Sequence, residues 1–403
     1  MINDSGAEYI IERLEALGYS AFYVGGCVRN ALLNEPIYDY DLCTSATPDQ
    51  IIQAFKRLKY LTVGVKHGTV TLIINDTPYE ITTFRTEELY SDFRHPDSVV
   101  FTADIHQDLK RRDFTINSLA YNKTLGIIDD FGGVYDTHNR LLRAVGDANK
   151  RFNEDALRIL RGMRFASTYN LKIVDETKNA MIFNAPLLLA VSAERIYSEF
   201  NKLILGESAC LILSQFVVIL QTLFPEIIYN DKFESCLKAI SLMPNDCALR
   251  YATLFLNCKE QFTQIAKRYK FDNKTANKIK LMHANYHLDL ISISTRAQVK
   301  KLMRYLQSDF LDYVNWRYLL ALTFGEEQLA NKAKDIIEIY NSVINSGECY
   351  TLKQLALNGN DLVALGITGN NVKILLDKAL SAVITQEIGN AKKEIIDYLG
   401  LNG

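Results

Sequence analysis

Two short motifs near the N-terminus combine adjacent glycines with a pair of acids. Gly25 and Gly26 stand side by side, and Asp39 and Asp41 follow with one residue between them. Adjacent glycines let a backbone approach a phosphate group closely. Aspartates two residues apart on a strand project from one face, where their carboxylates can bind a hard cation. Together the two motifs predict Mg²⁺-assisted transfer of a nucleotide, with Asp39 and Asp41 as metal ligands.

Glu80 is a candidate third carboxylate of this catalytic set. It stands in a β-rich run that we expect to form a strand. If that strand lies beside the one that carries the aspartates, the three carboxylates can act together. If it does not, Glu80 is a solvated strand residue, and the sequence leaves both interpretations open.

A basic motif occupies residues 110–117, which we expect on a helix spanning residues 104–121. Arg112 has the charge to neutralise a phosphate, and Asp113 can accept a hydrogen bond from a ribose hydroxyl. The alternative is a solvent-exposed helix face without a functional role, which a Lys-Arg-Arg-Asp run most often forms.

A further cluster offers a means of reading a base. We expect Asp155 and Arg158 as neighbours on one helix face, where a carboxylate acceptor beside a guanidinium donor complements cytosine (N4 and N3) and adenine (N6 and N1). Guanine and uracil present the reverse order and would leave polar groups unpaired, at about 1–3 kcal/mol each. The pair therefore predicts selection of CTP and ATP. The spacing of Glu154 and Arg158 is also that of a plain helix-surface ion pair.

Arg161 and Arg164 follow on the same helix, but their side chains point in different directions. Each step of three residues rotates a side chain by about 60° round a helix. The two arginines therefore cannot read the same base, and phosphate-binding or structural roles suit them better.

The composition excludes several classes of protein. The 403 residues are 48% hydrophobic and 23% charged, which is typical of a folded protein with more than one domain. A net charge of −2 predicts no global attraction to nucleic acid, so RNA must bind at local basic patches. Seven scattered cysteines without a CxxC pair argue for reduced thiols and against a zinc site. No run is apolar and long enough to span a membrane, and we expect a cytoplasmic protein.

The elements that must position these residues change in type along the chain. The first ~140 residues contain short β-rich runs at 21–24, 38–42, 69–74 and 79–84, the last two forming a hairpin, with a helix at 48–58. Thr47 and Asp104 are expected helix N-caps. Beyond Gly146 the pattern is helical almost throughout. Residues 85–99 read as a charged loop without secondary structure, and loops of this length are usually functional or disordered.

At this point the motifs resemble a known family. In order along the chain stand GGCVRN, DYDL, YEITTFRTE, LKRRDFTINSLAYN, FNEDALRILRGMRF and VSAERI. The chain is similar to class II tRNA nucleotidyltransferases, the CCA-adding enzymes, of the bacterial type without an HD domain. One such motif is modest support, whereas six in the same order are specific.

The resemblance implies an α+β fold with a small mixed β-sheet in the head, followed by all-α parts. The expected divisions are a catalytic head (1–140), a neck with the nucleotide-selecting motif (141–207), a body (208–290) and a tRNA-binding tail (291–403). By motif, Gly26 and Arg29 bind the nucleotide, with Gly25 beside them. Asp39 and Asp41 hold Mg²⁺, Arg112 contacts the nucleotide and Asp113 its ribose. Asp155 and Arg158 select the base, and Arg161 and Arg164 match nucleotide-contacting positions.

The implied activity is addition of CCA to the 3′ end of tRNA from CTP and ATP, by two-metal in-line transfer that releases pyrophosphate. A poly(A) polymerase, an enzyme that adds only CC or only A, and an inactive RNA-binding protein of the same fold remain alternatives. The 85–99 loop resembles that of complete CCA-adding enzymes. Monomer and homodimer are both left open.

RNA contacts are expected in the basic stretch between Lys259 and Lys280. Seven lysines and arginines stand there against two acids, enough for phosphate contacts to matter. The RNA-binding candidates are Lys267, Arg268, Lys270, Lys274 and Lys278. The alternative is a solvated face.

Overall fold

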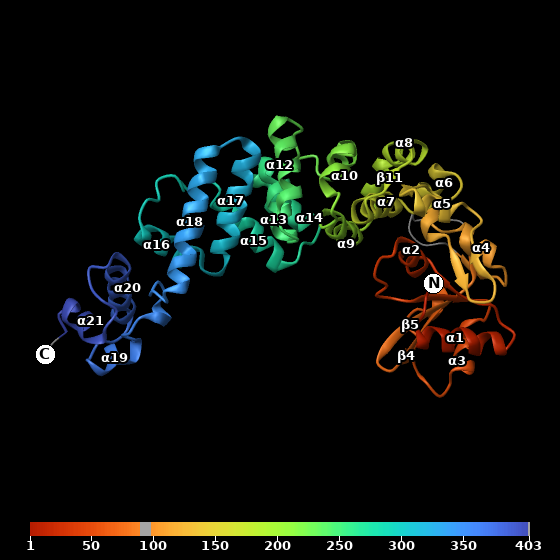
Figure 1. Cartoon of the computed structure of the whole chain (residues 1–403), viewed down its shortest axis with the longest axis horizontal. Coiled ribbons are helices and arrows are strands. Elements are labelled where there is room, and N and C mark those ends of the chain that lie inside the picture. The colour runs from red at the N-terminus through yellow and green to blue at the C-terminus, as the bar shows by residue number, and fades with distance from the viewer. Residues whose placement is uncertain (89–97, 402–403) are drawn as a thin grey trace. The chain divides into compact units, whose positions relative to one another are not determined.

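The N-terminal part of the chain is built on one mixed β-sheet (Figure 1). The computed structural model describes residues 1–88 and 98–401. The strands of the sheet are β1 (Ala21–Val24), β2 (Asp41–Thr44), β3 (Lys59–Leu61), β4 (Thr69–Ile74), β5 (Thr77–Thr83), β8 (Ala120–Asn122) and β9 (Gly126–Ile128). Their spatial order is β3-β4-β5-β2-β1-β8-β9. Neighbours are antiparallel except β2 and β5, which are parallel.

Both faces of the sheet are covered, so the central strand β1 is buried throughout. Ala21 and Tyr23 pack in one core with residues of α1 (Ser5–Ala16) and α3 (Pro48–Ala54). Phe22 and Val24 pack in a second core with Leu109 of α4 (Ile105–Lys110). Side chains that alternate between two cores are the result of the two-residue period of a strand.

Several expected elements are confirmed. β1 and β4 have the expected bounds, and β4 and β5 form the expected hairpin, although β5 is Thr77–Thr83 and not 79–84. Its turn residues Asn75 and Asp76 have φ of 48° and 62°, the left-handed values that tight hairpins need. Thr47 and Asp104 are N-caps, accepting hydrogen bonds from the backbone N–H groups of Gln50 and His106. Helix α3 is shorter than expected and ends at Ala54.

The second strand begins later than expected. We expected residues 38–42, whereas β2 is Asp41–Thr44. It pairs with β1 up to Tyr23↔Leu42, and one residue beyond Val24 the chain turns at Gly25 into α2 (Gly26–Leu33). Asp39 therefore has no strand partner on that side and lies in the segment that leads into β2.

The helix expected over residues 104–121 is wrong beyond Lys110. After α4 the chain forms a β-bridge between Phe114 and Ala144, a 3₁₀ turn η2 (Thr115–Asn117) and then β8. The backbone N–H of Thr115 donates to the carbonyl of Arg143 at 2.9 Å. This long-range pairing uses a backbone group that a continuous helix would need.

The loop expected over residues 85–99 is partly a second hairpin. β6 (Arg85–Glu88) pairs antiparallel with β7 (Ser98–Phe101), and residues 89–97 between them lie outside the described part of the chain.

Helices follow the sheet within the first of two compact units, which comprises Met1–Ile228 and Gln264–Phe271. They are α5 (Gly133–His138), α6 (Ala148–Glu154), α7 (Leu157–Tyr169), α8 (Asp175–Phe183), α9 (Ala193–Ile204), α10 (Ala209–Gln215) and α11 (Val217–Leu223), together with most of α14 (Phe262–Arg268), whose first two residues belong to the second unit. A short parallel pair, β10 (Leu141–Leu142) with β11 (Lys172–Ile173), interrupts the helices. Gly206 lies beside Ser167, where an added Cβ would come within 2.0 Å of its Oγ.

The second compact unit comprises Tyr229–Thr263 and Asp272–Gly403 and is helical where it is described. Its helices are α12 (Asp231–Leu242), α13 (Cys247–Leu254), α15 (Asn273–Ala284), α16 (Arg296–Leu306), α17 (Phe310–Phe324), α18 (Glu327–Asn345), α19 (Gly359–Ala364), α20 (Asn370–Thr385) and α21 (Lys392–Leu399). The expected fold class, a mixed sheet followed by helices, is confirmed. The expected division into four parts stays a prediction.

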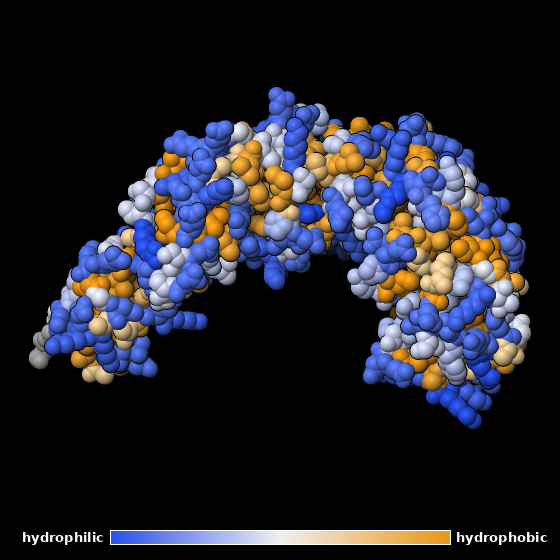
Figure 2. All heavy atoms as spheres, in the orientation of Figure 1, coloured by the Kyte–Doolittle hydropathy of each residue, from blue (hydrophilic) through white to orange (hydrophobic). Residues whose placement is uncertain are grey.

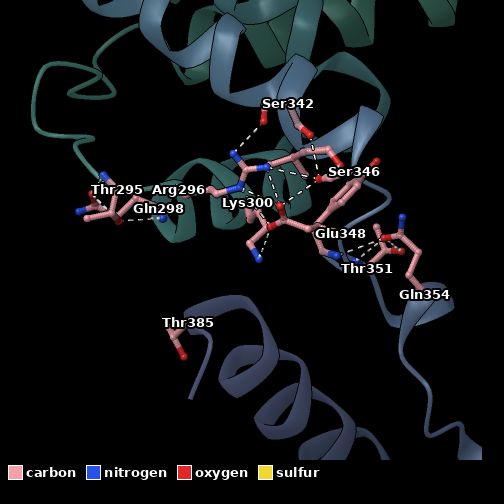
Figure 3. Close-up of polar contacts among 12 residues, drawn as sticks. Thr295, Arg296, Gln298, Lys300, Ser342, Ser346, Glu348, Thr351, Gln354 and Thr385 are labelled. Atoms are coloured by element: carbon pink, nitrogen blue, oxygen red, sulfur yellow. Dashed lines mark hydrogen bonds and ion pairs between the residues drawn. The ribbon is translucent and has the colours of Figure 1, made fainter. Parts of the chain in front are cut away.

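An ion cluster ties α16 to the segment that follows α18 (Figure 3). The carboxylate of Glu348 accepts hydrogen bonds from Nε of Arg296 at 2.9 and 3.2 Å, and the buried Lys300 lies 3.2 Å away. The hydrogen bonds from Arg296 lower the pKa of Glu348 to about 2. The C-terminal helices beyond this cluster have an apolar core of their own, which includes Leu357, Leu380 and Ile395.

Among the described residues, no helix is both long and apolar enough to cross a membrane. On the face shown in Figure 2, hydrophilic residues cover much of the surface and hydrophobic residues are exposed in patches between them.

Candidate active site

One cavity in the first unit gathers most of the predicted site residues. Its volume is about 780 Å³, within the usual range for a small-molecule site. The predicted residues that line it are Gly25, Gly26, Arg29, Asp39, Asp41, Arg112, Asp113, Asp155, Arg158, Arg161 and Arg164. Within the described part of the chain, eight arginines and four aspartates line it, an excess of four positive charges. Such a lining suits a strongly anionic ligand.

The glycine turn forms one wall of this cavity. Gly25 has φ of 69° and precedes the first residue of α2, a backbone conformation that side chains disfavour. A Cβ on Gly25 would also come within 3.1 Å of Nη1 of Arg112. The N–H groups at a helix N-terminus attract anions, so the start of α2 adds to the positive character of the cavity. Cys27 beside it is buried, and burial raises the pKa of its thiol to about 11, which disfavours a nucleophilic role.

The acidic residues lie where β2 begins. Asp41 is the first residue of β2 and stands opposite Glu80 of β5 in the parallel register, so the condition set for Glu80 is met. Glu80 does not line the cavity itself. Burial raises the pKa of the Asp41 carboxyl; Arg112 opposes this, while Glu80 and Asp39 add to it.

These carboxylates fit Mg²⁺ only as a partial ligand set. In the described residues no group of three His, Cys, Asp or Glu side chains is arranged to hold a metal ion by itself. Mg²⁺ is usually bound by one or two carboxylates together with water and substrate phosphates. The carboxylates of Asp39 and Asp41 are two hard oxygen donors and fit that pattern. Asp41 has acidic neighbours and a raised pKa.

Asp108 positions Arg112 in the cavity wall. The carboxylate of Asp108 is buried and forms ion pairs with Arg111 at 2.8 Å and Arg112 at 3.0 Å. Nε of Arg112 is buried and has no hydrogen-bond acceptor among the described residues. A buried donor without a partner costs free energy, so this nitrogen is suited to an acceptor atom of a ligand.

Asp113 is held by several donors at once. Its carboxylate accepts from Nε of Arg161 at 2.8 Å and from Nδ2 of Asn117 at 3.1 Å. Burial by itself would raise the pKa of Asp113, but Arg161 and Asn117 outweigh it and lower the pKa to about 2. Arg164 pairs with Glu199 at 2.8 Å, and Arg161 lies 4.0 Å from the same carboxylate. The two arginines thus share Glu199, while Arg161 also pairs with Asp113.

Asp155 and Arg158 both line the cavity, but they are not neighbours on one helix face as expected. The chain leaves the helix at Asp155, with φ of −143° between α6 and α7. The Asp155 carboxylate accepts from the N–H of Leu157 at 3.0 Å and from Nη2 of Arg195 at 2.7 Å. Arg158 pairs with Glu154 at 2.7 Å, the ion pair that the spacing also allowed.

The expectations did not include Phe165 and Tyr169, which also line the cavity. They stand seven and eleven residues after Arg158 on α7 and are therefore on the same helix face. This helical spacing from Arg158 could have identified Phe165 and Tyr169 from the sequence. Arg195 lines the cavity as well, through its ion pair with Asp155, and no local pattern indicates that contact.

The five RNA-binding candidates divide between the two compact units. In the first unit, Arg268 pairs with Glu226 at 2.8 Å and Lys270 pairs with Glu194. In the second, Lys278 pairs with Asp246 at 2.8 Å and Asp312 at 2.6 Å. Lys267 and Lys274 are exposed.

Two family models match the chain. Residues 21–143 match the poly A polymerase head domain, and residues 170–229 match the probable RNA and SrmB-binding site of polymerase A. The first match covers the sheet and three of the four aspartates that line the cavity.

Similar proteins are CCA-adding enzymes. One from Enterococcus faecalis is 52% identical over 197 residues, which are 49% of this chain and 48% of that protein, so this alignment spans about half of either protein. One from Lactobacillus delbrueckii subsp. bulgaricus is 34% identical over 400 residues, 97% of this chain and 96% of that protein. A crystal structure of the Bacillus stearothermophilus CCA-adding enzyme with CTP is 30% identical and has a TM-score of 0.78. It covers 99% of this chain and 98% of that one.

Proposed function

The chain belongs to the family of CCA-adding enzymes, and on that premise we propose that it adds C, C and A to the 3′ end of tRNA from CTP and ATP. In this reaction the 3′-hydroxyl of the tRNA attacks the α-phosphate in line. The bond to the β-phosphate breaks and pyrophosphate leaves. The observation that carries the proposal is a single cavity that combines carboxylates for a metal, arginines for phosphates and a pair of groups for a base.

Gly25, Gly26, Arg29 and Arg112 bind the triphosphate in this proposal. The glycine turn brings backbone N–H groups close to the cavity, and the buried Arg112 Nε is available to an acceptor. Asp113, ionised at neutral pH and fixed by Arg161, accepts from a ribose hydroxyl. Preorganised charges of this kind lower the barrier because they need not reorient during the reaction.

Asp39 and Asp41 are the proposed Mg²⁺ ligands, with Glu80 beside Asp41 as a third carboxylate. When bound, Mg²⁺ would supply activation of the attacking hydroxyl and neutralisation of the charge on the triphosphate and leaving pyrophosphate, which is the two-metal scheme. Asp39 and Asp41 would hold that charge in the arginine-lined cavity.

Asp155 and Arg158 are the proposed readers of the base. The two hydrogen bonds that Asp155 accepts orient its carboxylate, and a carboxylate has about four acceptor positions. Asp155 can therefore also accept from the amino group of cytosine or adenine. The ion pair with Glu154 orients the Arg158 guanidinium, whose N–H groups are suited to a ring-nitrogen acceptor. Arg161 and Arg164 contribute positive charge and support the neighbouring groups.

Lys267, Arg268, Lys270, Lys274 and Lys278 are proposed contacts for tRNA phosphates. The exposed Lys267 and Lys274 are the better candidates, because the ion pairs of the other three compete with phosphate binding.

Incubation of the purified protein with tRNA that lacks its terminal CCA, and with each nucleoside triphosphate in turn, tests the activity. We expect two additions from CTP and one from ATP. Incorporation of UMP or GMP as readily as CMP would contradict the proposal. ATP-only extension by many residues on generic RNA would indicate a poly(A) polymerase, and tRNA binding without transfer an inactive relative.

A further inference from the structure

The guanidinium of Arg29 is a buried cation without a carboxylate partner among the described residues. It is 5% exposed. Its Nη1 donates to the side-chain oxygen of Asn117 at 2.5 Å, and its Nη2 to that of Asn30 at 2.9 Å. Nη2 also donates to the hydroxyl of Tyr169 at 2.7 Å. Because each of these acceptors is neutral, the charge of Arg29 is left to attract an anion.

Tyr169 contacts this cation in two ways. Its ring lies 4.3 Å from the central carbon of the Arg29 guanidinium, a distance typical of a cation–π contact. Its hydroxyl oxygen accepts the hydrogen bond described above. A phenol that accepts one hydrogen bond still has its own proton to donate, and among the described residues none accepts it. Tyr169 lines the cavity, so this donor is suited to a ligand there.

The backbone and ring of Tyr169 are held in place. Tyr169 is the last residue of α7, and its carbonyl oxygen accepts from Nη1 of Arg140 at 2.9 Å. Its ring stacks on that of Phe165, one helical turn earlier, with centroids 6.4 Å apart and planes at 25°. A donor on a rigid aromatic ring loses little conformational freedom when it binds.

The position of Tyr169 along α7 indicates which part of a nucleotide it faces. It stands eleven residues after Arg158 on the same helix face, about 16 Å along the axis at 1.5 Å per residue. The base-reading pair lies at the N-terminal end of α7, whereas Tyr169 lies at the other end beside Arg29. The triphosphate is therefore the part of the ligand within reach of Tyr169.

We propose that Tyr169 is a further nucleotide-binding residue, whose hydroxyl orients Arg29 and donates a hydrogen bond to the triphosphate. This inference rests on the proposed function, since it takes the ligand to be CTP or ATP. It predicts a contact that is independent of the base, because Tyr169 lies far from the base-reading pair.

Three variants test the contact. Tyr169→Phe removes the hydroxyl and keeps the ring against Arg29, whereas Tyr169→Leu removes both. Tyr135→Phe is the matched control, because Tyr135 is 65% exposed and is not among the residues that line the cavity. Inorganic pyrophosphate is the probe, measured by calorimetry with Mg²⁺ present, because it has neither base nor ribose. KM and kcat for CTP, ATP and tRNA follow on the same proteins.

We expect Tyr169→Phe to weaken pyrophosphate binding, and to raise KM for CTP and ATP alike, by about 10- to 100-fold, the size of one hydrogen bond to a charged group. KM for tRNA and the preference for CTP over UTP should stay as in Tyr135→Phe. The melting temperature should fall modestly, because Nη2 of Arg29 loses one acceptor. Tyr169→Leu should bind pyrophosphate at least as weakly as Tyr169→Phe.

Wild-type affinity for pyrophosphate in Tyr169→Phe would overturn the proposal, and so would a loss confined to one nucleotide or to tRNA. The proposed function fails separately, if the wild-type protein adds no CCA. In that case a weaker affinity of Tyr169→Phe for pyrophosphate would still support Tyr169 as a ligand of polyphosphates.

Discussion

Replacing Asp155 by asparagine changes the base-reading pair with almost no change in shape. In the wild-type protein both carboxylate oxygens accept hydrogen bonds, one from the N–H of Leu157 at 3.0 Å and one from Arg195 at 2.7 Å. Asparagine has a single oxygen, so one of these donors must face the amide NH₂ group. Whichever way the amide turns, the acceptor for the amino group of cytosine or adenine is weakened.

The size of the effect follows from the lost interaction. A hydrogen bond to a charged group contributes about 1.5–3 kcal/mol, so kcat/KM for CTP and ATP should fall on the order of 10- to 100-fold. UTP has a carbonyl where CTP has the amino group, and an asparagine NH₂ can donate to it. The ratio of CTP to UTP incorporation should therefore fall by a larger factor than kcat/KM for CTP does, because UTP incorporation rises as CTP incorporation falls.

Single-nucleotide addition to a tRNA that ends just before the first C measures both rates. Asp147→Asn is the matched control. Asp147 is an exposed N-cap of the adjacent helix α6, accepting from the N–H of Lys150, and asparagine caps helices as well as aspartate does. If Asp155→Asn discriminates between CTP and UTP as well as Asp147→Asn does, the base is not read by Asp155.

Three further changes have distinct expected outcomes. Asp39→Ala should abolish nucleotide transfer while tRNA affinity, measured by gel shift, stays nearly intact; undiminished turnover would refute its role as a metal ligand. Arg158→Ala should blur selection against UTP in the same addition assay, and an unchanged nucleotide preference would show that the base is read elsewhere. The Asp113 carboxylate has a pKa of about 2 in the folded protein against 3.8 unperturbed. It therefore stabilises the fold by about 2 kcal/mol above pH ~4, and this is lost as the pH falls towards ~2. The unfolding free energy of the wild type in urea should then approach that of Asp113→Asn across this window, and a constant difference down to pH ~3 would contradict the assignment.

Local patterns were sufficient wherever the cause of a structure is local. β1 and β4 have the bounds that their β-rich runs predict, since strand-forming residue types act locally. The hairpin turn at Asn75 and Asp76 and the N-caps Thr47 and Asp104 were also predictable. Each depends on hydrogen bonds or backbone angles within a few residues.

Local patterns failed where distant segments compete for the same backbone groups. The helix expected over residues 104–121 ends at Lys110 because Phe114 and Thr115 pair with residues near Ala144. The helix expected through Asp155 breaks there, where the Asp155 carboxylate pairs with Arg195, 40 residues away. In both places helix propensity is a weak preference that tertiary pairing overrides.

The order of the motifs, the types of side chain available for chemistry and the glycines that permit tight turns are all present in the amino-acid sequence alone. Which side chains contact one another is decided by the packing of the chain. Arg29 and Tyr169 are 140 residues apart, and no pattern of neighbours relates them. Contacts of this kind form only when the sheet and the helices have packed, because the entropy lost in closing a long loop must be offset by the burial of many other groups.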